Sequence, residues 1–173
     1  MIAYAITSHS LNLEPFANRA EMIVYRDKSN ANYAQNAKHF LDDARAYKFS
    51  KILLHTDYKL AYELGADGVH LSSQQFNEIK NAKVLGLFVI VSTHTLKEAS
   101  DAQKQGADMI TLSPIFSTPN KGEPKGLDFL LEVAKAIEIP IIALGGILTQ
   151  EQIEACREHG ASGFASIRYF STQ

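Results

Sequence analysis

The chain repeats one pattern along its length: a short, continuously apolar segment is followed by a longer amphipathic one. Runs such as LFVIVST and IPIIALGG do not alternate with polar residues, which is typical of parallel strands buried on both faces. Strands are predicted at Ile2–Thr7, Glu21–Asp27, Lys51–Thr56, Gly68–Leu71, Phe88–Thr93, Met109–Pro114, Pro140–Gly145 and Gly163–Tyr169.

The segments between these strands have the periodicity of amphipathic helices. Helices are predicted at Tyr33–Lys48, Thr95–Gln105, Leu127–Ile137 and Thr149–His159. The second and the fourth begin with a threonine three residues before a glutamate or a glutamine, which is the spacing of a capping box. Gly65, Gly106 and Gly160 each open a Gly-Ala step just before a strand, where glycine fits the left-handed position that ends a helix.

This alternation predicts an α/β fold, a small (β/α)8 TIM barrel with truncated first and last helices, in a single domain over residues 1–173. A doubly wound open sheet is the alternative, because repetition of the unit does not fix closure. Residues 9–20 are too few for a full first helix. The closing helix is expected to be missing, because only Ser171–Gln173 follow the eighth strand. The exposed flank that would result favours a homodimer.

Composition narrows the classes of partner. The formal net charge is −2, and acidic and basic residues are interspersed along the sequence. The sequence therefore lacks the basic stripe that would indicate nucleic-acid binding. No apolar run reaches the roughly 18 residues of a membrane span. The opening MIAYAITS lacks the pattern of a signal peptide, so a cytoplasmic protein is expected. The one cysteine, Cys156, excludes an internal disulfide and is predicted to be a buried small hydrophobe.

A barrel of this type binds its ligands at the C-terminal ends of its strands, which makes the residues after each strand the candidates for a site. After the seventh strand, Gly145 and Gly146 allow backbone amides to approach a phosphate. After the eighth strand, Arg168 offers two donors to the same phosphate. A tight turn and a surface arginine are the alternatives.

Two further segments offer polar groups. The loop over residues 113–126 exceeds the usual length of a βα loop, and it carries Thr118 and Asn120 for hydrogen bonds and Lys121 against an anion. A merely solvated loop is the alternative. Near the end of the second strand, Arg26 and Lys28 are expected on the same side of the chain, where they could bind a polyanion. The alternative is a surface ion-pair cluster of these two residues with Asp27.

Histidines near the ends of three strands, His55, His70 and His94, raise the question of a metal site. Their spacing is not diagnostic and carboxylates are sparse around them, so a metal site is not favoured. His94 is expected to start a helix, and His39 and His159 are expected on helix surfaces.

Three runs carry a resemblance to the thiamine phosphate synthase/TenI family. They are GADGVHL at Gly65–Leu71, SPIFSTPNKG at Ser113–Gly122 and PIIALGGI at Pro140–Ile147. In that family a pyrimidine methyl diphosphate ionises to a carbocation and pyrophosphate, and the ring nitrogen of a thiazole phosphate captures the cation. The resemblance therefore implies small-molecule phosphate substrates.

The resemblance also assigns roles to residues of this chain. It places Arg26, Lys28 and Lys121 on the diphosphate and Ser92 against the pyrimidine. The residues it places around the thiazole phosphate are Thr118, Asn120, Gly146, Ile167 and Arg168.

The sequence departs from the family pattern at several positions. Val24 replaces a glutamine, His55-Thr56 replaces Asn-Asp, and Ser72–Gln75 replaces Gly-Gln-Glu-Asp. Both aspartates that would bind Mg²⁺ are therefore replaced, by Thr56 and Gln75, and neutral oxygens hold this ion poorly. The expectation is that Mg²⁺ is carried by the substrate phosphates, with no other cofactor. Asp57 is one residue out of register to replace the missing aspartate.

The functional hypotheses follow from these matches and departures. A divergent thiamine phosphate synthase is favoured by the cations and the serine that are kept. A TenI-type thiazole tautomerase is the first alternative, although Pro114 stands where that branch has a histidine, so His55 or His70 would supply the imidazole. A non-catalytic thiazole phosphate-binding protein is the second alternative, and an unrelated phosphosugar enzyme is the last.

Overall fold

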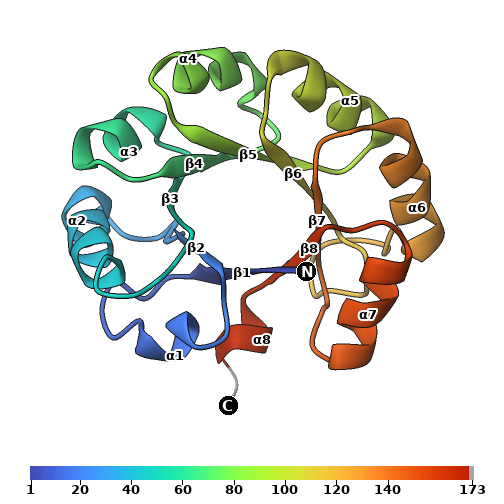
Figure 1. Ribbon diagram of the computed structural model, residues 1–173, viewed down its shortest axis with the longest axis horizontal. Helices are drawn as coiled ribbons and strands as arrows, with labels where there is room; N and C mark the ends of the chain where they lie inside the picture. Colours follow the sequence, from blue (N-terminus) through green and yellow to red (C-terminus); the bar gives the residue numbers. More distant parts are fainter. Residues whose placement is uncertain (172–173) are drawn as a thin grey trace.

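The computed structural model describes residues 1–171; Thr172 and Gln173, the last two residues of the predicted domain, lie outside the described residues. Its strands form a closed barrel in which each strand pairs in parallel with the next, and the last pairs with the first (Figure 1). They are β1 (Ile2–Thr7), β2 (Met22–Tyr25), β3 (Lys51–His55), β4 (Gly68–Leu71), β5 (Phe88–Thr93), β6 (Met109–Leu112), β7 (Ile141–Leu144) and β8 (Gly163–Ser166). The predicted barrel is confirmed, and the open sheet is excluded.

The helices surround the barrel (Figure 1). They are α1 (Glu14–Ala17), α2 (Tyr33–Ala44), α3 (Tyr58–Leu64), α4 (Ile79–Val84), α5 (Leu96–Gln105), α6 (Leu127–Ala136), α7 (Gln150–Glu158) and α8 (Arg168–Ser171), with a 3₁₀ turn, η1, at Phe76–Glu78. The first and last helices have four residues each, so the predicted truncation is confirmed.

The end of the chain differs from the prediction in two respects. β8 ends at Ser166 and not at Tyr169, because the chain turns into α8 and the hydroxyl of Ser166 accepts the backbone N–H of Tyr169 at 3.0 Å. The prediction of a missing closing helix is also wrong, since α8 buries Phe170, whose ring stacks on Phe164. The guanidinium of Arg19 lies 4.7 Å from the centre of the Tyr169 ring and joins this helix to the α1 side.

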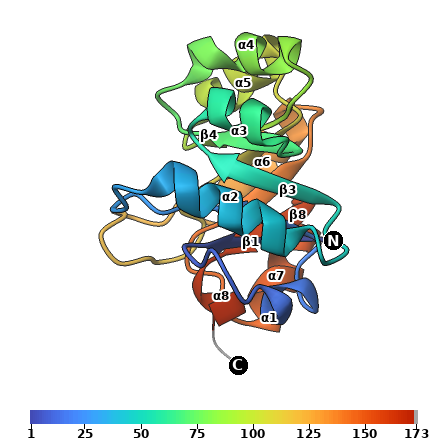
Figure 2. The same cartoon turned by 90° about the vertical axis from the view of Figure 1, so that its left-hand side faces the viewer.

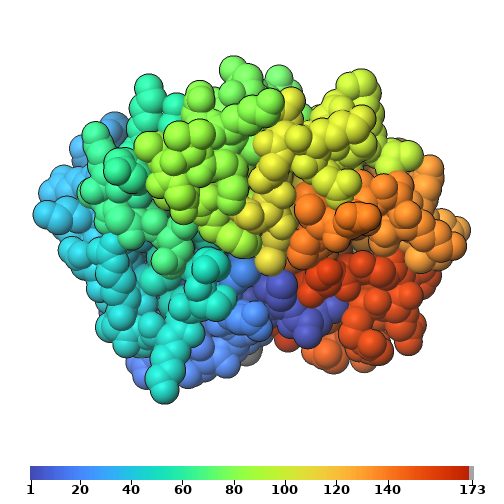
Figure 3. All heavy atoms as spheres, turned by 45° about the horizontal axis from the view of Figure 1, so that its top comes forward, coloured from blue at the N-terminus to red at the C-terminus, as the bar shows by residue number. Residues whose placement is uncertain are grey.

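The flank between β8 and β1 is therefore covered by the chain itself. Figure 3 shows the N-terminal residues beside the C-terminal ones, closing the ring of packed elements. The argument for a homodimer rested on this flank being exposed, and that premise no longer holds. The oligomeric state itself stays a prediction.

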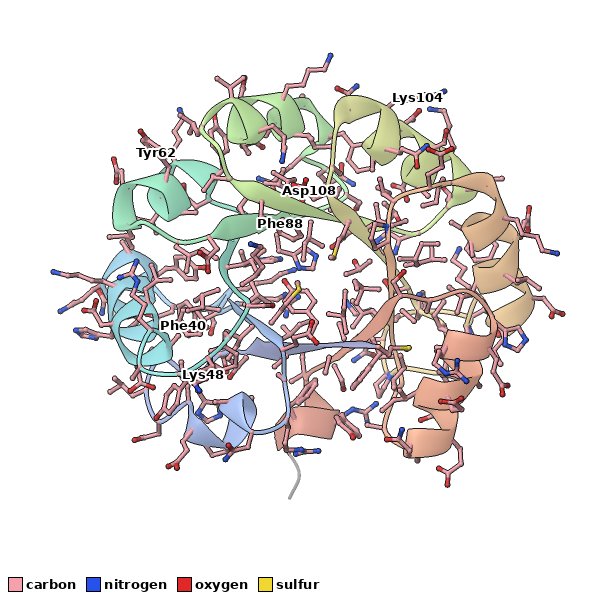
Figure 4. The ribbon with its side chains drawn as sticks, in the orientation of Figure 1. Phe40, Lys48, Tyr62, Phe88, Lys104 and Asp108 are labelled. Carbon is pink, nitrogen blue, oxygen red and sulfur yellow. The ribbon has the colours of Figure 1, made fainter. Side chains whose placement is uncertain are left out.

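Side chains of the strands divide into two cores because successive residues point to opposite faces. The inner core fills the barrel with Tyr4, Ile6, Met22, Val24, Leu53, Ile90, Ile142 and Ala165. The outer core packs between strands and helices, where Phe40 of α2 is fully buried (Figure 4). On the outside of the helices, Tyr62 of α3 and Lys104 of α5 point away from the barrel.

Local signals place the helices as expected. Thr149 forms a complete capping box with Gln152 at the start of α7. At α5 the Thr95 hydroxyl accepts the backbone N–H of Glu98, so Thr95 and not His94 starts that helix. Side-chain caps of this kind each stabilise a helix by about 1 kcal/mol. Gly65 and Gly106 end their helices with φ of +74° and +99°, as predicted.

Two expectations from composition can be compared with the structure. Within residues 1–171, no helix has the length and apolar character needed to cross a membrane. Cys156 is buried in α7, as predicted, and burial raises the pKa of its thiol to about 11.

Candidate active site at the C-terminal end of the barrel

A cavity of about 990 Å³ opens at the C-terminal ends of the strands. It contains every residue for which the sequence predicted a catalytic or substrate-binding role. These are Arg26, Lys28, His55, His70, Ser92, Thr118, Asn120, Lys121, Gly145, Gly146, Ile167 and Arg168. Their roles stay predictions, but the structure brings all of them to one place.

Strand alternation explains why these side chains face the cavity. Val24, Leu53 and Ile90 belong to the inner core. The residue two positions further along each strand points the same way, one layer nearer the cavity. Those residues are Arg26, His55 and Ser92, which all line it.

His70 is the buried centre of a hydrogen-bond chain that ends at the cavity. The phenol oxygen of Tyr4 lies 2.9 Å from Nδ1 of His70, and Nε2 of His70 lies 3.0 Å from the hydroxyl oxygen of Ser92. Burial raises the pKa of Tyr4 well above its usual value, so the phenol keeps its proton and can donate a hydrogen bond to Nδ1 in the tautomer that has its hydrogen on Nε2. Nε2 then carries the hydrogen and donates to Ser92, whose own hydroxyl hydrogen can point at a ligand.

The two histidines in the cavity are held neutral. Burial lowers the pKa of His70 to about 3, with smaller contributions from the charges of His55 and Arg26. Burial also lowers the pKa of His55 to about 4, assisted by the charges of Arg26 and Lys28. The rings meet edge to face with centres 5.8 Å apart. At neutral pH both imidazoles therefore act as uncharged donors or acceptors.

Tyr33 of α2 fixes the ends of β2 and β3. Its hydroxyl donates to the carbonyl of Tyr25 at 2.9 Å and accepts the backbone N–H of His55 at 3.1 Å. Its ring stacks on Tyr25, whose ring stacks in turn on Phe40. One hydroxyl thus bridges the last residues of β2 and β3, next to the side chains of Arg26 and His55 in the cavity.

Arg26, Lys28 and Lys121 form a cationic cluster on one side of the cavity. The pKa of Lys28 is lowered chiefly by the charge of Arg26, then by burial and by the charge of Lys121. Lys121 comes from the loop of residues 113–126, which projects on the same side of the molecule as the segment after β2 (Figure 2). Among the ion pairs of residues 1–171, none includes a member of this cluster.

The Asp27 alternative is not supported by the structure. Its carboxylate accepts the backbone N–H of Ser29 at 3.3 Å and the Ser29 hydroxyl at 3.1 Å. It is therefore turned into its own loop and does not neutralise Arg26 or Lys28.

Gly145 and Gly146 lie where the β7 loop touches the loop after β6. A Cβ added at Gly146 would lie 2.4 Å from the carbonyl oxygen of Ser117, and one at Gly145 would lie 2.7 Å from Cα of Pro114. The φ angles of Gly145 and Gly146 are +107° and +68°, in the region that favours glycine. The two glycines therefore shape the cavity wall through close packing, and their role in binding a phosphate stays a prediction.

Several residues that hold this site were missed by sequence reasoning. The Ser166 hydroxyl donates to the carbonyl of Ile147 at 3.1 Å and joins the β7 loop to β8. The sequence placed His94 at a helix start, but the structure shows it lining the cavity, with Nδ1 3.0 Å from the carbonyl oxygen of Ser113. Tyr4 could have been recognised from the sequence, because its phenol stands at an inward position of a mostly apolar strand. Nothing in the sequence distinguishes Ser166 or Tyr33 in this way.

The residues at the family's magnesium positions do not fit a protein-bound Mg²⁺. The side-chain oxygen of Gln75 accepts the N–H of Ser72, and its nitrogen donates to the Thr56 carbonyl and to Glu78, all within 3.0 Å. Thr56 and Gln75 line a second, smaller cavity together with Asp57, Tyr58, Lys59 and Glu78. Among residues 1–171, no group of three His, Cys, Asp or Glu side chains could hold a metal.

The comparisons with known proteins all indicate the same family. The sequence profile of the thiamine monophosphate synthase family matches residues 4–170. The Aquifex aeolicus protein named "Putative thiamine-phosphate synthase 2" is 37% identical over 96% of each chain. The thiamine-phosphate synthase of Chlorobium phaeobacteroides is 36% identical over 88% of this chain and 76% of its own length.

A solved structure gives the same result. Thiamine phosphate pyrophosphorylase from Pyrococcus furiosus superposes with a TM-score of 0.79 at 27% identity. The superposition covers 96% of this chain and 85% of the other.

Proposed function

This chain belongs to the thiamine monophosphate synthase family, and on that premise we propose that it is a thiamine-biosynthetic transferase that joins a pyrimidine methyl diphosphate to a thiazole phosphate. The observation that carries the proposal is the cavity itself. One space holds a cationic cluster, a neutral centre with Ser92 and His70, and a glycine turn beside Arg168. Two substrates, each an uncharged ring that carries an anionic group, match this distribution of charge when their rings meet at the neutral centre.

The transfer reaction requires a different role from each part of the cavity. The bond between the pyrimidine methylene carbon and the diphosphate oxygen breaks, and the electron pair leaves with pyrophosphate. Arg26, Lys28 and Lys121 stabilise the charge that develops on those oxygens, where preorganised donors act on the transition state more than on the ground state. The thiazole nitrogen then donates its lone pair to the methylene carbon and forms the new C–N bond.

The hydrogen-bond chain gives Ser92 its role in this scheme. Its Oγ accepts from Nε2 of His70, so its own hydrogen is available for an acceptor nitrogen of the pyrimidine. Arg168 and the amides of the Gly145-Gly146 turn bind the thiazole phosphate. Because residues 56 and 75 supply no ligand for it, any Mg²⁺ would be carried by the substrate phosphates.

The test is a chromatographic assay of thiamine phosphate formed from the two substrates. We expect product with the wild-type chain and a loss of at least 100-fold in kcat/KM with Lys121→Ala. Lys104→Ala is the matched control, because Lys104 lies on the outside of α5 and should leave the rate unchanged (Figure 4). Binding of the thiazole phosphate without any product would refute the synthase and leave a binding protein.

One observation favours a second candidate, a thiazole tautomerase. The imidazole of His55 lines the cavity and is neutral, so it can take a proton from a bound thiazole. Its pKa of about 4 makes it a weak base at neutral pH, which ranks this activity second. The tautomerase predicts exchange of a thiazole proton with deuterium from solvent, and this exchange should be lost in His55→Asn.

A further inference from the structure

Positive charge is concentrated in the cavity although the whole chain is slightly acidic. The sequence has 17 Lys and Arg against 19 Asp and Glu. The cationic side chains that line the cavity are Arg26, Lys28, Lys121, Lys125 and Arg168. Glu123 is the one carboxylate among the described residues that line it. The charge of a bound polyanion can thus be balanced by this chain's own side chains.

The positive charges of the cationic cluster repel one another, and no described ion pair offsets this repulsion. Arg26, Lys28 and Lys121 are close enough for the two other charges to lower the pKa of Lys28. The nearest acid in sequence, Asp27, is engaged by Ser29. Arg26 is half-buried, and burial lowers its pKa. A bound anion would relieve this repulsion, and an anion of higher charge would relieve it more.

The family's metal positions lie outside the cavity that holds the cationic cluster. The amide of Gln75 is hydrogen-bonded to Thr56, Ser72 and Glu78, and Gln75 lines the smaller cavity, to which Asp57, Glu78 and Lys59 also contribute. A divalent cation there would meet the neutral oxygens of Thr56 and Gln75, the ammonium group of Lys59 and two carboxylates that already accept hydrogen bonds, Asp57 from the backbone N–H of Leu60 and Glu78 from the amide of Gln75. None of the described residues lines both this cavity and the one that holds the cationic cluster, so an ion held there would not be bound among the residues of the cluster.

Resting on the proposed function, we propose that this chain binds the diphosphate of its substrate as a metal-free polyanion. The cluster of Arg26, Lys28 and Lys121 takes the place of a bound magnesium ion. Mg²⁺ then competes with the cluster for the diphosphate. An ion that coordinates the diphosphate oxygens neutralises negative charge that the side chains would otherwise bind. Binding is therefore as tight or tighter when Mg²⁺ is removed.

The test uses inorganic pyrophosphate and the full chain in isothermal titration calorimetry. Titrations are run in EDTA and in excess MgCl₂ at the same ionic strength, because binding of this kind depends on salt. The expected Kd in EDTA is lower than the Kd in MgCl₂, or within threefold of it. A Kd more than threefold higher in EDTA would overturn the proposal.

Variants show whether the cluster is responsible. Lys28→Ala should weaken binding in EDTA at least tenfold, and Arg26→Lys should weaken it less than Arg26→Ala because it keeps the charge but loses the two-donor geometry. Lys59→Ala, in the smaller cavity, is the matched control and should change Kd less than twofold. Equal losses in Lys28→Ala and Lys59→Ala would show binding outside the cluster and overturn the proposal.

The outcome is separable from that of the proposed function. Metal-free binding of pyrophosphate through Lys28, with no thiamine phosphate formed from the substrates, would support this inference and refute the synthase. Formation of thiamine phosphate, together with pyrophosphate binding that requires Mg²⁺, would support the synthase and refute this inference.

Discussion

The phenol oxygen of Tyr4 lies 2.9 Å from Nδ1 of His70, although the two residues are 66 positions apart in the sequence. Their rings also stack, with centres 5.7 Å apart. Tyr4 belongs to the inner core of the barrel, whereas His70 lines the cavity. A hydrogen bond donated by the Tyr4 phenol to Nδ1 goes with the tautomer that has its hydrogen on Nε2, and the tautomer decides whether Ser92 presents a donor or an acceptor to a ligand. A residue of β1 thereby sets the hydrogen bonding of a residue on β5.

Tyr4→Phe should reveal this dependence. The substitution keeps the ring but leaves Nδ1 of His70 buried without its donor, which costs about 1–3 kcal/mol of unfolding free energy. KM for the pyrimidine substrate should rise, because the orientation of Ser92 is no longer fixed. Urea denaturation and steady-state kinetics measure the two effects. Tyr62→Phe, on the exposed face of α3, is the control and should change neither by more than experimental error.

Stability should depend on pH through the neutral histidines. The folded-state pKa values of His70 and His55 are about 3 and about 4, below the value near 6.5 of an unfolded histidine. Between those values the unfolded chain binds more protons than the folded one, so the free energy of unfolding falls as the pH falls. The slope for each buried histidine is about 1.4 kcal/mol per pH unit between roughly pH 4 and pH 6.

Carboxylates also titrate in that range, so the histidine contribution is isolated by difference. His70→Asn removes one titrating group, whatever it does to absolute stability. We expect its stability to fall less steeply from pH 6 to pH 4 than that of the wild type, by about 1.4 kcal/mol per pH unit. Identical slopes for the two proteins in urea denaturation would show that His70 is not kept neutral by the fold.

Tyr33→Phe should loosen the strand ends that carry the cationic cluster and His55. It removes hydrogen bonds to the backbone of Tyr25 and His55, at a cost of about 1–2 kcal/mol. Because Arg26 directly follows Tyr25, affinity for pyrophosphate should also fall severalfold. Tyr47→Phe, which packs on Phe49 and does not line the cavity, is the control for loss of a phenol hydroxyl. Unchanged pyrophosphate affinity in Tyr33→Phe would contradict this positioning role.

The order and type of elements could be predicted from sequence because each obeys a local rule. The continuous apolar runs at β5 and β7 allowed only buried parallel strands, and the predicted span of β5 matches the structure. That these residues line one cavity was also predictable, since barrel geometry brings the C-terminal ends of the strands, with Arg26 and His55, to one end, and the family resemblance added Ser92.

The hydrogen-bond partners of those residues could not be predicted in the same way. The contact of Tyr4 with His70 and that of Tyr33 with Tyr25 and His55 depend on helix placement and strand register across the closed barrel. The end of β8 was mispredicted for a related reason. The strand was predicted to continue through Tyr169, whereas the structure starts a helix at Arg168 and packs Phe170 of that helix against Phe164.

Gly146→Ala tests whether the glycine turn shapes the cavity through packing. Gly146 and Gly86 have φ angles of +68° and +84°, so alanine carries a similar backbone penalty at either position. They differ in surroundings: a Cβ at Gly146 would lie 2.4 Å from the carbonyl oxygen of Ser117, whereas none of the described atoms lies within 4 Å of one at Gly86. Gly146→Ala should therefore lose about 1–3 kcal/mol more in urea denaturation than Gly86→Ala. It should also raise KM for the thiazole phosphate, because the loop that carries Thr118 must shift to admit the methyl group. Equal losses of stability with an unchanged KM would mean that the turn serves only backbone conformation, and that contact between the two loops does not shape the phosphate end of the cavity.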